Sequence, residues 1–289
     1  MQQVSSARLC VWAAVLCVIL PSADPARAGN EPDLLLEVAG LDVAVWAPSG
    51  GQAIYPLVLF SHGFHGCNTQ STYLMRALAE HGMLVVAPDH EDRGRNCPDE
   101  LPTPEEMAKI LLSPNLDDLL SPHRGDELQK LRAALPTDPT LSQWAIDPDR
   151  VALIGHSLGG YTALGRAAAR PQTQEIAAVV ALAPFVLPFL IDGAVKNISV
   201  PVLLQSGGQD KITLSKHHDI VFAEFTAPTC KVVYVGANHF AWTDIEPTEF
   251  HDATAAATIA FLDEVFAGRP LDEAALARPG TDQSQECKN

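Results

Sequence analysis

Short apolar segments alternate with amphipathic segments along most of the chain. The apolar segments that we expect to form strands are residues 34–45, 55–61, 83–88, 151–154, 176–183, 202–205 and 231–235. Segments with helical spacing lie between and after them, at residues 69–81, 125–135, 160–170, 214–225 and 250–266. Strands that alternate with helices are typical of a parallel sheet with right-handed crossovers and helices on both faces. The pattern therefore predicts an α/β fold with a mostly parallel central sheet.

Three stretches break this alternation. Residues 89–124 are rich in proline and charge, and we expect an excursion over the end of the preceding strand, a candidate lid with a short helix at residues 104–112. Residues 147–149 are expected to form a turn, and residues 184–200 an irregular apolar stretch. The polar residues 269–289 are expected to be a loose tail. Because no repeat or linker divides the rest, residues 29–289 are interpreted as one domain.

The first 28 residues have the pattern of a secretory signal peptide. Arg8 supplies a positive charge, residues 9–20 are apolar, and Ala26-Arg27-Ala28 is a small-x-small cleavage site before Gly29. The alternative is a membrane anchor, but the apolar stretch is short for a bilayer. We therefore expect a secreted or periplasmic protein with no stable membrane insertion after cleavage.

The composition fits a globular domain with an acidic surface. The 289 residues are 47% hydrophobic and carry a formal net charge of −16, which disfavours nucleic acid and anionic membranes as partners. Four cysteines remain after the signal segment, and in an oxidising compartment they allow three pairings. We favour Cys67 with Cys97, on loops at one end of the sheet, and Cys230 with Cys287, which would tether the tail.

The stretch VALIGHSLGGYTALG places a serine at a turn between a strand and a helix. Gly155 and Gly159 flank Ser157 in a G-x-S-x-G pattern, and a tight turn there requires residues without a side chain. The hydroxyl would project from the sheet edge at the start of a helix, where free backbone N–H groups stabilise an oxyanion. Ser157 is the candidate nucleophile.

Two further strand ends carry the residue types that activate a serine. Asp210 follows the strand at 202–205, and His239 follows the strand at 231–235. A histidine takes the serine proton, and a carboxylate orients and stabilises that histidine. Functional groups gather beyond the carboxyl ends of parallel strands, so these loops are expected to converge. Asp192 and Asp244 are the alternatives for the acid.

The other histidines have structural interpretations. His156 is expected to be buried packing, His217 and His218 to lie on a solvated helix surface, and His62 and His65 to belong to the loop after the strand at 55–61. His90-Glu91-Asp92 resembles a metal-ligand cluster only by composition. With no phosphate-binding loop and no dinucleotide fingerprint, we expect neither metal nor cofactor.

Several stretches together resemble a known superfamily. They are SHGFHGCNTQSTYL, HGMLVVAPDH, IDPDRVALIGHSLGGYTAL, LAPF, VPVLLQSGGQDKIT and GANHF. With the order Ser, acid, His, they are similar to the α/β-hydrolase superfamily, in the branch of dienelactone hydrolases, chlorophyllase-like and platelet-activating-factor-acetylhydrolase-like esterases and cutinase-like polyester hydrolases. The resemblance covers residues 55–240 and departs at residues 89–124, which are longer than in compact polyester hydrolases.

The resemblance implies the α/β-hydrolase fold and an oxyanion hole. By position, the backbone N–H groups of Phe64 and Leu158 would face the developing negative charge, and Phe64 and Phe185 would flank the substrate. The function it implies is a carboxylic-ester hydrolase that forms an acyl-enzyme on a small-molecule or polymeric ester. The alternatives are a polyester or lipid hydrolase, a dienelactone or thioester hydrolase on the same triad, and a non-catalytic binding protein of the same fold.

Overall fold

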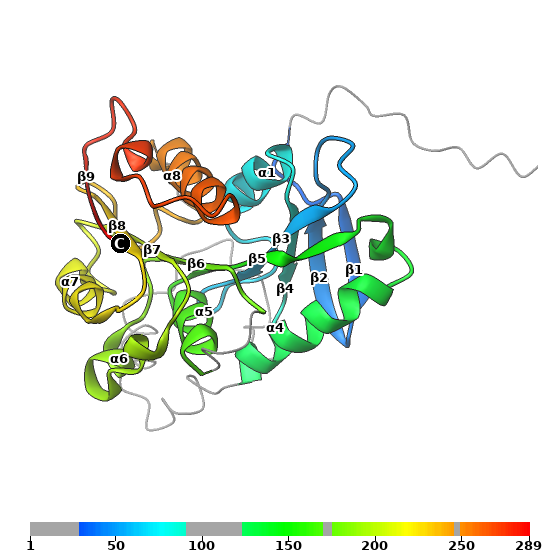
Figure 1. The fold of residues 1–289 in the computed structure, drawn as a ribbon, viewed down its shortest axis with the longest axis horizontal. Coiled ribbons are helices and arrows are strands. Elements are labelled where there is room, and N and C mark those ends of the chain that lie inside the picture. The colour runs from blue at the N-terminus through cyan, green and yellow to red at the C-terminus, as the bar shows by residue number, and fades with distance from the viewer. Residues whose placement is uncertain (1–28, 91–122, 170–174, 246–248) are drawn as a thin grey trace, which may run out of the picture.

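A nine-stranded sheet organises the structure, a computed structural model that describes residues 29–90, 123–169, 175–245 and 249–289. The strand order is β1-β2-β4-β3-β5-β6-β7-β8-β9, and the block from β4 to β8 is parallel while β1, β2 and β9 pair antiparallel. The mostly parallel α/β fold is therefore confirmed (Figure 1). The strands are β1 Leu34–Val38, β2 Leu41–Trp46, β3 Tyr55–Ser61, β4 Leu84–Pro88, β5 Ile146–His156, β6 Ala178–Leu182, β7 Val202–Gly207, β8 Thr229–Tyr234 and β9 Gln283–Lys288.

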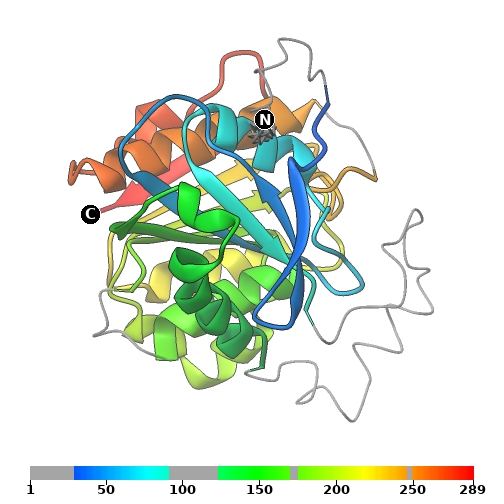
Figure 2. The same ribbon diagram turned by 90° about the vertical axis from the view of Figure 1, so that its right-hand side faces the viewer.

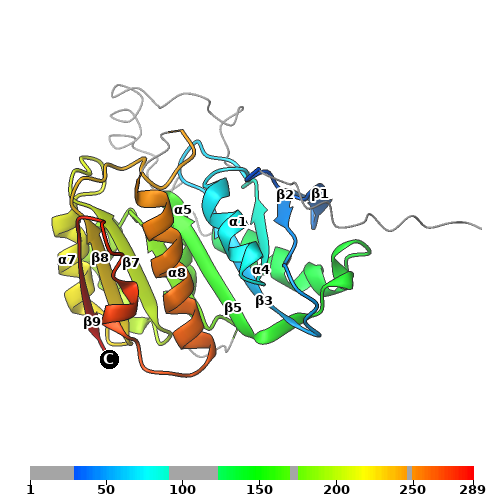
Figure 3. The same cartoon turned by 90° about the horizontal axis from the view of Figure 1, so that it is seen from above.

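Helices cover both faces of this sheet. Helices α1 (Thr72–Glu80) and α8 (Phe250–Phe266) pack side by side on one face, as Figure 3 shows. The other α-helices of the described ranges pack on the opposite face, and they are α4 (His123–Ala134), α5 (Leu158–Ala169), α6 (Leu187–Asp192) and α7 (Ser215–Glu224). Four 3₁₀ helices complete the described residues: η1 Leu135–Thr137, η2 Leu141–Gln143, η3 Ala194–Asn197 and η4 Glu273–Leu276.

The central strands are apolar throughout because both of their faces are buried. In β3 every residue is buried. Val58 and Phe60 point into the core under α1 and α8, whereas Leu57 and Leu59 point into the core under α4 and α5. Successive strand residues face opposite sides of a sheet, so a strand covered on both sides needs apolar residues at every position. This explains why the continuous apolar runs in the sequence are strands.

Two stretches differ in detail from the sequence expectation. Residues 147–149 are expected from the sequence to form a turn before the strand, but β5 already begins at Ile146 and contains them. Tyr55 pairs with Ile146 and Leu57 pairs with Val151, so the expected turn is an irregularity inside the paired strand. The stretch 184–200 is not wholly irregular either, since it contains α6 and η3.

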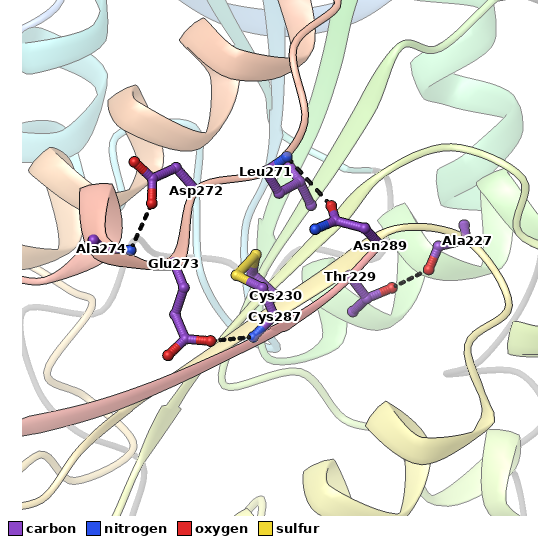
Figure 4. Close-up of a disulfide and its surroundings, with 9 residues drawn as sticks. All are labelled: Ala227, Thr229, Cys230, Leu271, Asp272, Glu273, Ala274, Cys287 and Asn289. Atoms are coloured by element: carbon purple, nitrogen blue, oxygen red, sulfur yellow. Dashed lines mark hydrogen bonds between the residues drawn. A yellow bond between two sulfur atoms is a disulfide. The ribbon is translucent and has the colours of Figure 1, made fainter.

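The C-terminal tail is not loose. Residues Gln283–Lys288 form β9, which pairs antiparallel along the full length of β8. A disulfide joins Cys230 to Cys287 across these two strands, as expected from the sequence (Figure 4). Figure 2 shows this strand, in red, on the side of the molecule opposite the blue hairpin of β1 and β2. The backbone pairing and the disulfide together hold a polar segment that hydrophobicity alone does not predict.

Several expectations concern parts of the chain outside the described residues. They are the signal segment at 1–28, most of the candidate lid at 89–124, and Cys97, so the Cys67–Cys97 pairing stays a prediction. Within the ranges that the structure does describe, no helix is both long and apolar enough to cross a bilayer.

Candidate functional site

Ser157 stands at the turn between β5 and α5 in a left-handed backbone conformation, with φ of 53°. Two glycines make this turn possible. A Cβ atom at Gly155 would lie 2.2 Å from the carbonyl oxygen of Gly159, and one at Gly159 would lie 1.9 Å from the carbonyl oxygen of Ser61. The left-handed conformation costs a non-glycine residue about 1–3 kcal/mol, and such strain gathers at functional sites. The local backbone thus explains the G-x-S-x-G pattern.

The serine is the first member of a hydrogen-bonded chain of three side chains. The Ser157 Oγ lies 3.0 Å from Nε2 of His239, and Nδ1 of His239 lies 2.8 Å from Oδ2 of Asp210. His239 and Asp210 are 4% and 5% exposed, so water competes little for these contacts. The three residues come from the loops after β5, β8 and β7. The structure therefore brings together the three residues that the sequence nominated.

The carboxylate of Asp210 is oriented by its own loop. The backbone N–H groups of Ile212 and Thr213 both donate to its Oδ1 at 2.8 Å, and the Thr213 hydroxyl donates to Oδ2 at 2.7 Å. Burial by itself would raise the pKa of Asp210, but the hydrogen bond and charge of His239 and the hydrogen bonds from Thr213 outweigh it and lower the pKa. The group is thus held as a carboxylate facing the imidazole.

The two alternative acids lie elsewhere. A carboxylate oxygen of Asp192 accepts the N–H of Ala194 at 2.8 Å, at the end of α6. A carboxylate oxygen of Asp244 accepts the N–H of Thr72 at 2.7 Å, at the start of α1. Asp192 bonds local backbone, and Asp244 bonds the first residue of α1, which is distant in the sequence. Only Asp210 contacts the imidazole of His239.

A small cavity opens beside the serine hydroxyl. Leu158 is the first residue of α5, where backbone N–H groups precede the intrahelical ladder. Phe64 lies on the facing loop, which lines the same cavity. The cavity is lined by Gly63, Phe64, Gly66, Gln70, His156, Ser157, His239, Phe240, Thr243 and Ile245. The arrangement places two backbone segments with candidate oxyanion donors at the nucleophile.

Phe185 is not among the residues that line this cavity, and its expected contact with the substrate stays a prediction. Its backbone N–H donates to the carbonyl oxygen of Ser157 at 3.0 Å, and its ring packs edge-on near Tyr161 with centroids 6.4 Å apart. Its backbone thus connects the segment after β6 to the serine turn, and the phenylalanines that line the cavity are Phe64 and Phe240.

Two buried histidines support the loops around the site. His156 is buried as expected, and burial together with the charge of His239 lowers its pKa to about 3. The sequence places His218 on a solvated surface, but in the structure it is fully buried. Its ring nitrogens lie 2.7 Å from the Ser206 hydroxyl and 2.8 Å from the carbonyl oxygen of Pro184. It links the end of β7 to the segment after β6, a role that the polar sequence around it does not reveal.

A second buried polar cluster lies under the loop that carries Phe64. His90 contacts the Ser61 hydroxyl at 2.7 Å and a carboxylate oxygen of Glu127 at 2.5 Å. Arg124 donates to the carbonyl oxygen of His62 at 2.7 Å. His90 thus takes part in a buried hydrogen-bond network. Across the described ranges, no three His, Cys, Asp or Glu side chains gather as metal ligands.

Comparison with known proteins defines the class. Residues 58–279 match the model of the alpha/beta hydrolase family. Because this match spans more than half of the chain, the protein belongs to that family.

Individual relatives have names that refer to ester hydrolysis. The chain is 32% identical over 126 residues to "Esterase YjfP" of Escherichia coli (strain K12), which covers 43% of this chain and 45% of the relative. It is 27% identical over 202 residues to "Cutinase est2" of Thermobifida alba, covering 66% of this chain and 57% of the relative. "Cutinase est1" of the same organism matches at 27% over 202 residues, 66% of this chain and 58% of the relative. The chain thus spans about half the length of the curated relatives it matches.

Proposed function

We propose that the protein is a serine hydrolase that cleaves carboxylic esters through an acyl-enzyme. The observation that carries the proposal is the continuous hydrogen-bond chain from the Ser157 hydroxyl through His239 to Asp210. A serine is a poor nucleophile until a base takes its proton, and this arrangement supplies the base and the group that orients it. The relatives named esterase and cutinase point to the same bond type.

The reaction follows from the roles of these three side chains. The Ser157 Oγ attacks the ester carbonyl carbon while Nε2 of His239 takes its proton. The Asp210 carboxylate stabilises the imidazolium through Nδ1. His239 then returns the proton to the leaving alcohol, and the acyl group stays on Ser157. A water molecule, deprotonated by His239, attacks the acyl-enzyme and releases the carboxylic acid and the free serine.

The negative charge on the carbonyl oxygen needs donors at each tetrahedral stage. We assign this role to the backbone N–H groups of Phe64 and Leu158, which belong to segments on either side of the Ser157 hydroxyl. Removing one such donor typically costs about 10² to 10³ in rate. Because the donors are backbone groups, loop geometry rather than side-chain identity sets their effect.

The central test is the variant Ser157→Ala. We expect it to lower hydrolysis of p-nitrophenyl acetate and butyrate by at least about 10⁴-fold, with a Tm close to that of the wild type. The exposed Ser142→Ala serves as the matched control and should retain full activity. A fluorophosphonate probe should label the wild type and not Ser157→Ala. Undiminished turnover in Ser157→Ala would reject the mechanism, and a wild type that neither turns over esters nor labels would support a binding protein instead.

A polymeric ester is the second candidate substrate class. The relatives named cutinase match over a longer part of the chain than the relative named esterase. In addition, Leu187 and Ile191 expose 39% and 90% of their surface on α6, four residues apart on one face of that helix. An apolar surface near the carboxyl ends of the strands favours adsorption to an insoluble ester. Release of soluble product from a polyester film, and its loss in Leu187→Ser/Ile191→Ser without loss of soluble-ester activity, would support this candidate.

We also propose that the mature protein is exported. The signal pattern at residues 1–28 and the Cys230–Cys287 disulfide both fit an oxidising compartment outside the cytoplasm. Mass spectrometry of protein from the native host should find Gly29 as the N-terminal residue. An intact N-terminus on cell-associated protein would contradict this proposal.

A further inference from the structure

The two peptide units that lead to the Phe64 N–H are both fixed by hydrogen bonds. In the unit between His62 and Gly63, the carbonyl oxygen accepts from Arg124 at 2.7 Å and the N–H donates to Oε1 of Gln70 at 3.1 Å. In the next unit, the carbonyl oxygen of Gly63 accepts from the N–H of Gly66 at 3.1 Å and from Nδ1 of His62 at 2.8 Å. A trans peptide points its N–H opposite to its carbonyl oxygen. Holding the Gly63 carbonyl therefore fixes the direction of the Phe64 N–H.

Gln70 connects this loop to the loop of the base. Its Nε2 lies 3.0 Å from Nδ1 of His156, and Nε2 of His156 lies 2.9 Å from the carbonyl oxygen of His239. A carbonyl oxygen only accepts, so His156 carries its proton on Nε2 and accepts on Nδ1. Gln70 must then turn its amino group to His156 and its oxygen to the N–H of Gly63. Every donor in this chain meets an acceptor.

We infer that Gln70 is a positioning residue of the site, which aligns the Phe64 N–H against His239 through a hydrogen-bond strut with His156. The inference rests on the proposed function, since it assigns a task to a donor of the oxyanion hole. Gln70 acts through Gly63 and His156, and it sets the distance between the group that stabilises the oxyanion and the group that moves the proton. A displacement of about 1 Å at such a site costs on the order of 10² in rate.

The side chains of Gln70 and His156 pack directly against two glycines, where a larger residue would not fit. A Cβ atom at Gly66 would lie 2.2 Å from Oε1 of Gln70, and a Cβ atom at Gly63 would lie 3.0 Å from Nδ1 of His156. A Cβ atom at Gly66 would also lie 3.0 Å from Cβ of His62 and 3.1 Å from the carbonyl oxygen of Gly63, so Gln70 and the Gly63 peptide pack closely against the same glycine. The depressed pKa of His156, about 3, keeps its Nδ1 an acceptor over the working pH range of an esterase.

The variant Gln70→Met tests the inference because methionine fills similar space and lacks both hydrogen-bonding groups. On p-nitrophenyl butyrate we expect kcat to fall about 10- to 100-fold while KM changes less than about twofold. Phenylboronic acid forms a tetrahedral adduct on an active serine, and its affinity should fall by the same factor as kcat/KM. The matched control is Gln143→Met, since Gln143 is exposed on η2 and bonds only locally. It should behave as the wild type.

A double-mutant cycle with His156→Gln tests the strut itself. If Gln70 and His156 act as one unit, the double variant loses about as much kcat as the more damaging single variant. A raised KM with unchanged kcat would mean that Gln70 is a substrate contact, and fully additive losses would mean that no strut exists; either result overturns the inference.

These outcomes separate the inference from the proposed function. Full activity in Ser157→Ala overturns the proposed function. Wild-type kcat and boronate affinity in Gln70→Met, in an enzyme that requires Ser157, overturn only the positioning role. If a Tm measurement shows that His156→Gln does not fold, Gln70→Met still tests the positioning role through its kcat and its boronate affinity, because Gln70 is only half-buried.

Discussion

Two histidine–aspartate pairs lie near opposite ends of the parallel strands, one beyond the carboxyl ends and one near the amino ends. His239 and Asp210 stand beyond the carboxyl ends of the parallel strands at 2.8 Å, with 5% and 0% of their side chains exposed. His81 and Asp263, on the loop after α1 and on α8, are 2.9 Å apart with 40% and 45% exposed. The distances are nearly equal, but only the buried pair is shielded from water and further bonded to a serine. Geometry between two residues is therefore not enough to define a site.

The cavities beside the two pairs show the same contrast. The larger, about 330 Å³, lies near the amino ends of β3 and β4 and is lined by both members of the exposed pair. The one beside Ser157 is about 40 Å³. In the larger cavity Arg150 pairs with Asp147 and Arg269 with Glu264, neighbours on the chain. Ion pairs between partly exposed side chains contribute little free energy. The larger cavity is thus lined by ordinary surface ion pairs, and cavity size alone does not identify the candidate site.

The largest effect is expected when the acid of each pair is changed to its amide. Asp210→Asn should lower kcat for p-nitrophenyl butyrate by about 10⁴-fold, because an amide stabilises the wrong tautomer of His239 and cannot balance the imidazolium. Asp263→Asn, the matched change at the other end of the strands, should leave kcat within about twofold. Equal effects in steady-state assays of the two variants would remove the distinction between the pairs.

The next effect concerns the backbone at the serine turn. Gly159→Ala forces a Cβ atom to 1.9 Å from the Ser61 carbonyl oxygen, so we expect a loss of at least about 3 kcal/mol in the free energy of unfolding. Gly165→Ala, on the same helix, meets only an ordinary contact at 3.9 Å. It should be neutral or stabilise by up to about 1 kcal/mol. Urea unfolding monitored by circular dichroism compares them, and similar midpoints would show that the turn is looser than its contacts indicate.

A smaller loss is expected from the edge strand. Cys230 and Cys287 are 57 residues apart in sequence, and removing a disulfide of this loop length costs about 2–4 kcal/mol. The double variant Cys230→Ser/Cys287→Ser should lose that much stability. Its kcat at temperatures below unfolding should stay within about threefold, since Cys230 lies at the start of β8 and the loop of His239 follows the other end of that strand. A loss of kcat without a loss of Tm would mean that the disulfide acts on the site itself.

The smallest effect is a pH dependence of stability. Burial lowers the pKa of His218 to about 4, whereas in the unfolded chain it is about 6.5. Below about pH 6.5 the unfolded state binds a proton that the folded state takes up only near pH 4, so stability falls as the pH drops through this window. His218→Asn should flatten that fall by about 1 kcal/mol per pH unit, and the half-exposed His217→Gln should not. Identical slopes in urea titrations from pH 7 to 4.5 would contradict the assignment.

The parallel core and the three nominated side chains could be predicted because their signals are local. Continuous apolar runs such as residues 55–61 are strands buried on both faces, and the two glycines around Ser157, directly after another such run, mark a tight turn. Asp210 and His239 lie on the loops that follow β7 and β8, so the topology of a parallel sheet brings them to the same end of the strands. In a parallel sheet, the position of a residue after its strand thus predicts where that residue lies in space.

What could not be predicted depends on partners that the fold supplies. The polar strand β9 exists because β8 offers an open edge and a cysteine, and neither can be read from residues 283–288. His218 lies among polar helix residues, and it is buried against Ser206 of β7 and Pro184 of the segment after β6. The proposed role of Gln70 likewise depends on its hydrogen bond with His156, which lies 86 residues later in the chain. Long-range polar contacts of this kind leave no periodic pattern in the sequence.

The position of β9 has a consequence for synthesis of the protein. The strand that leads to His239 completes its backbone pairing only with residues Gln283–Lys288, and both α8 and η4 come between the two strands in the chain. A nascent polypeptide therefore cannot close this edge of the sheet until the codons for β9 have been translated and that segment has left the ribosome. Until that moment the partially folded chain presents an open strand edge, and the histidine loop is attached to a scaffold that is still one strand short.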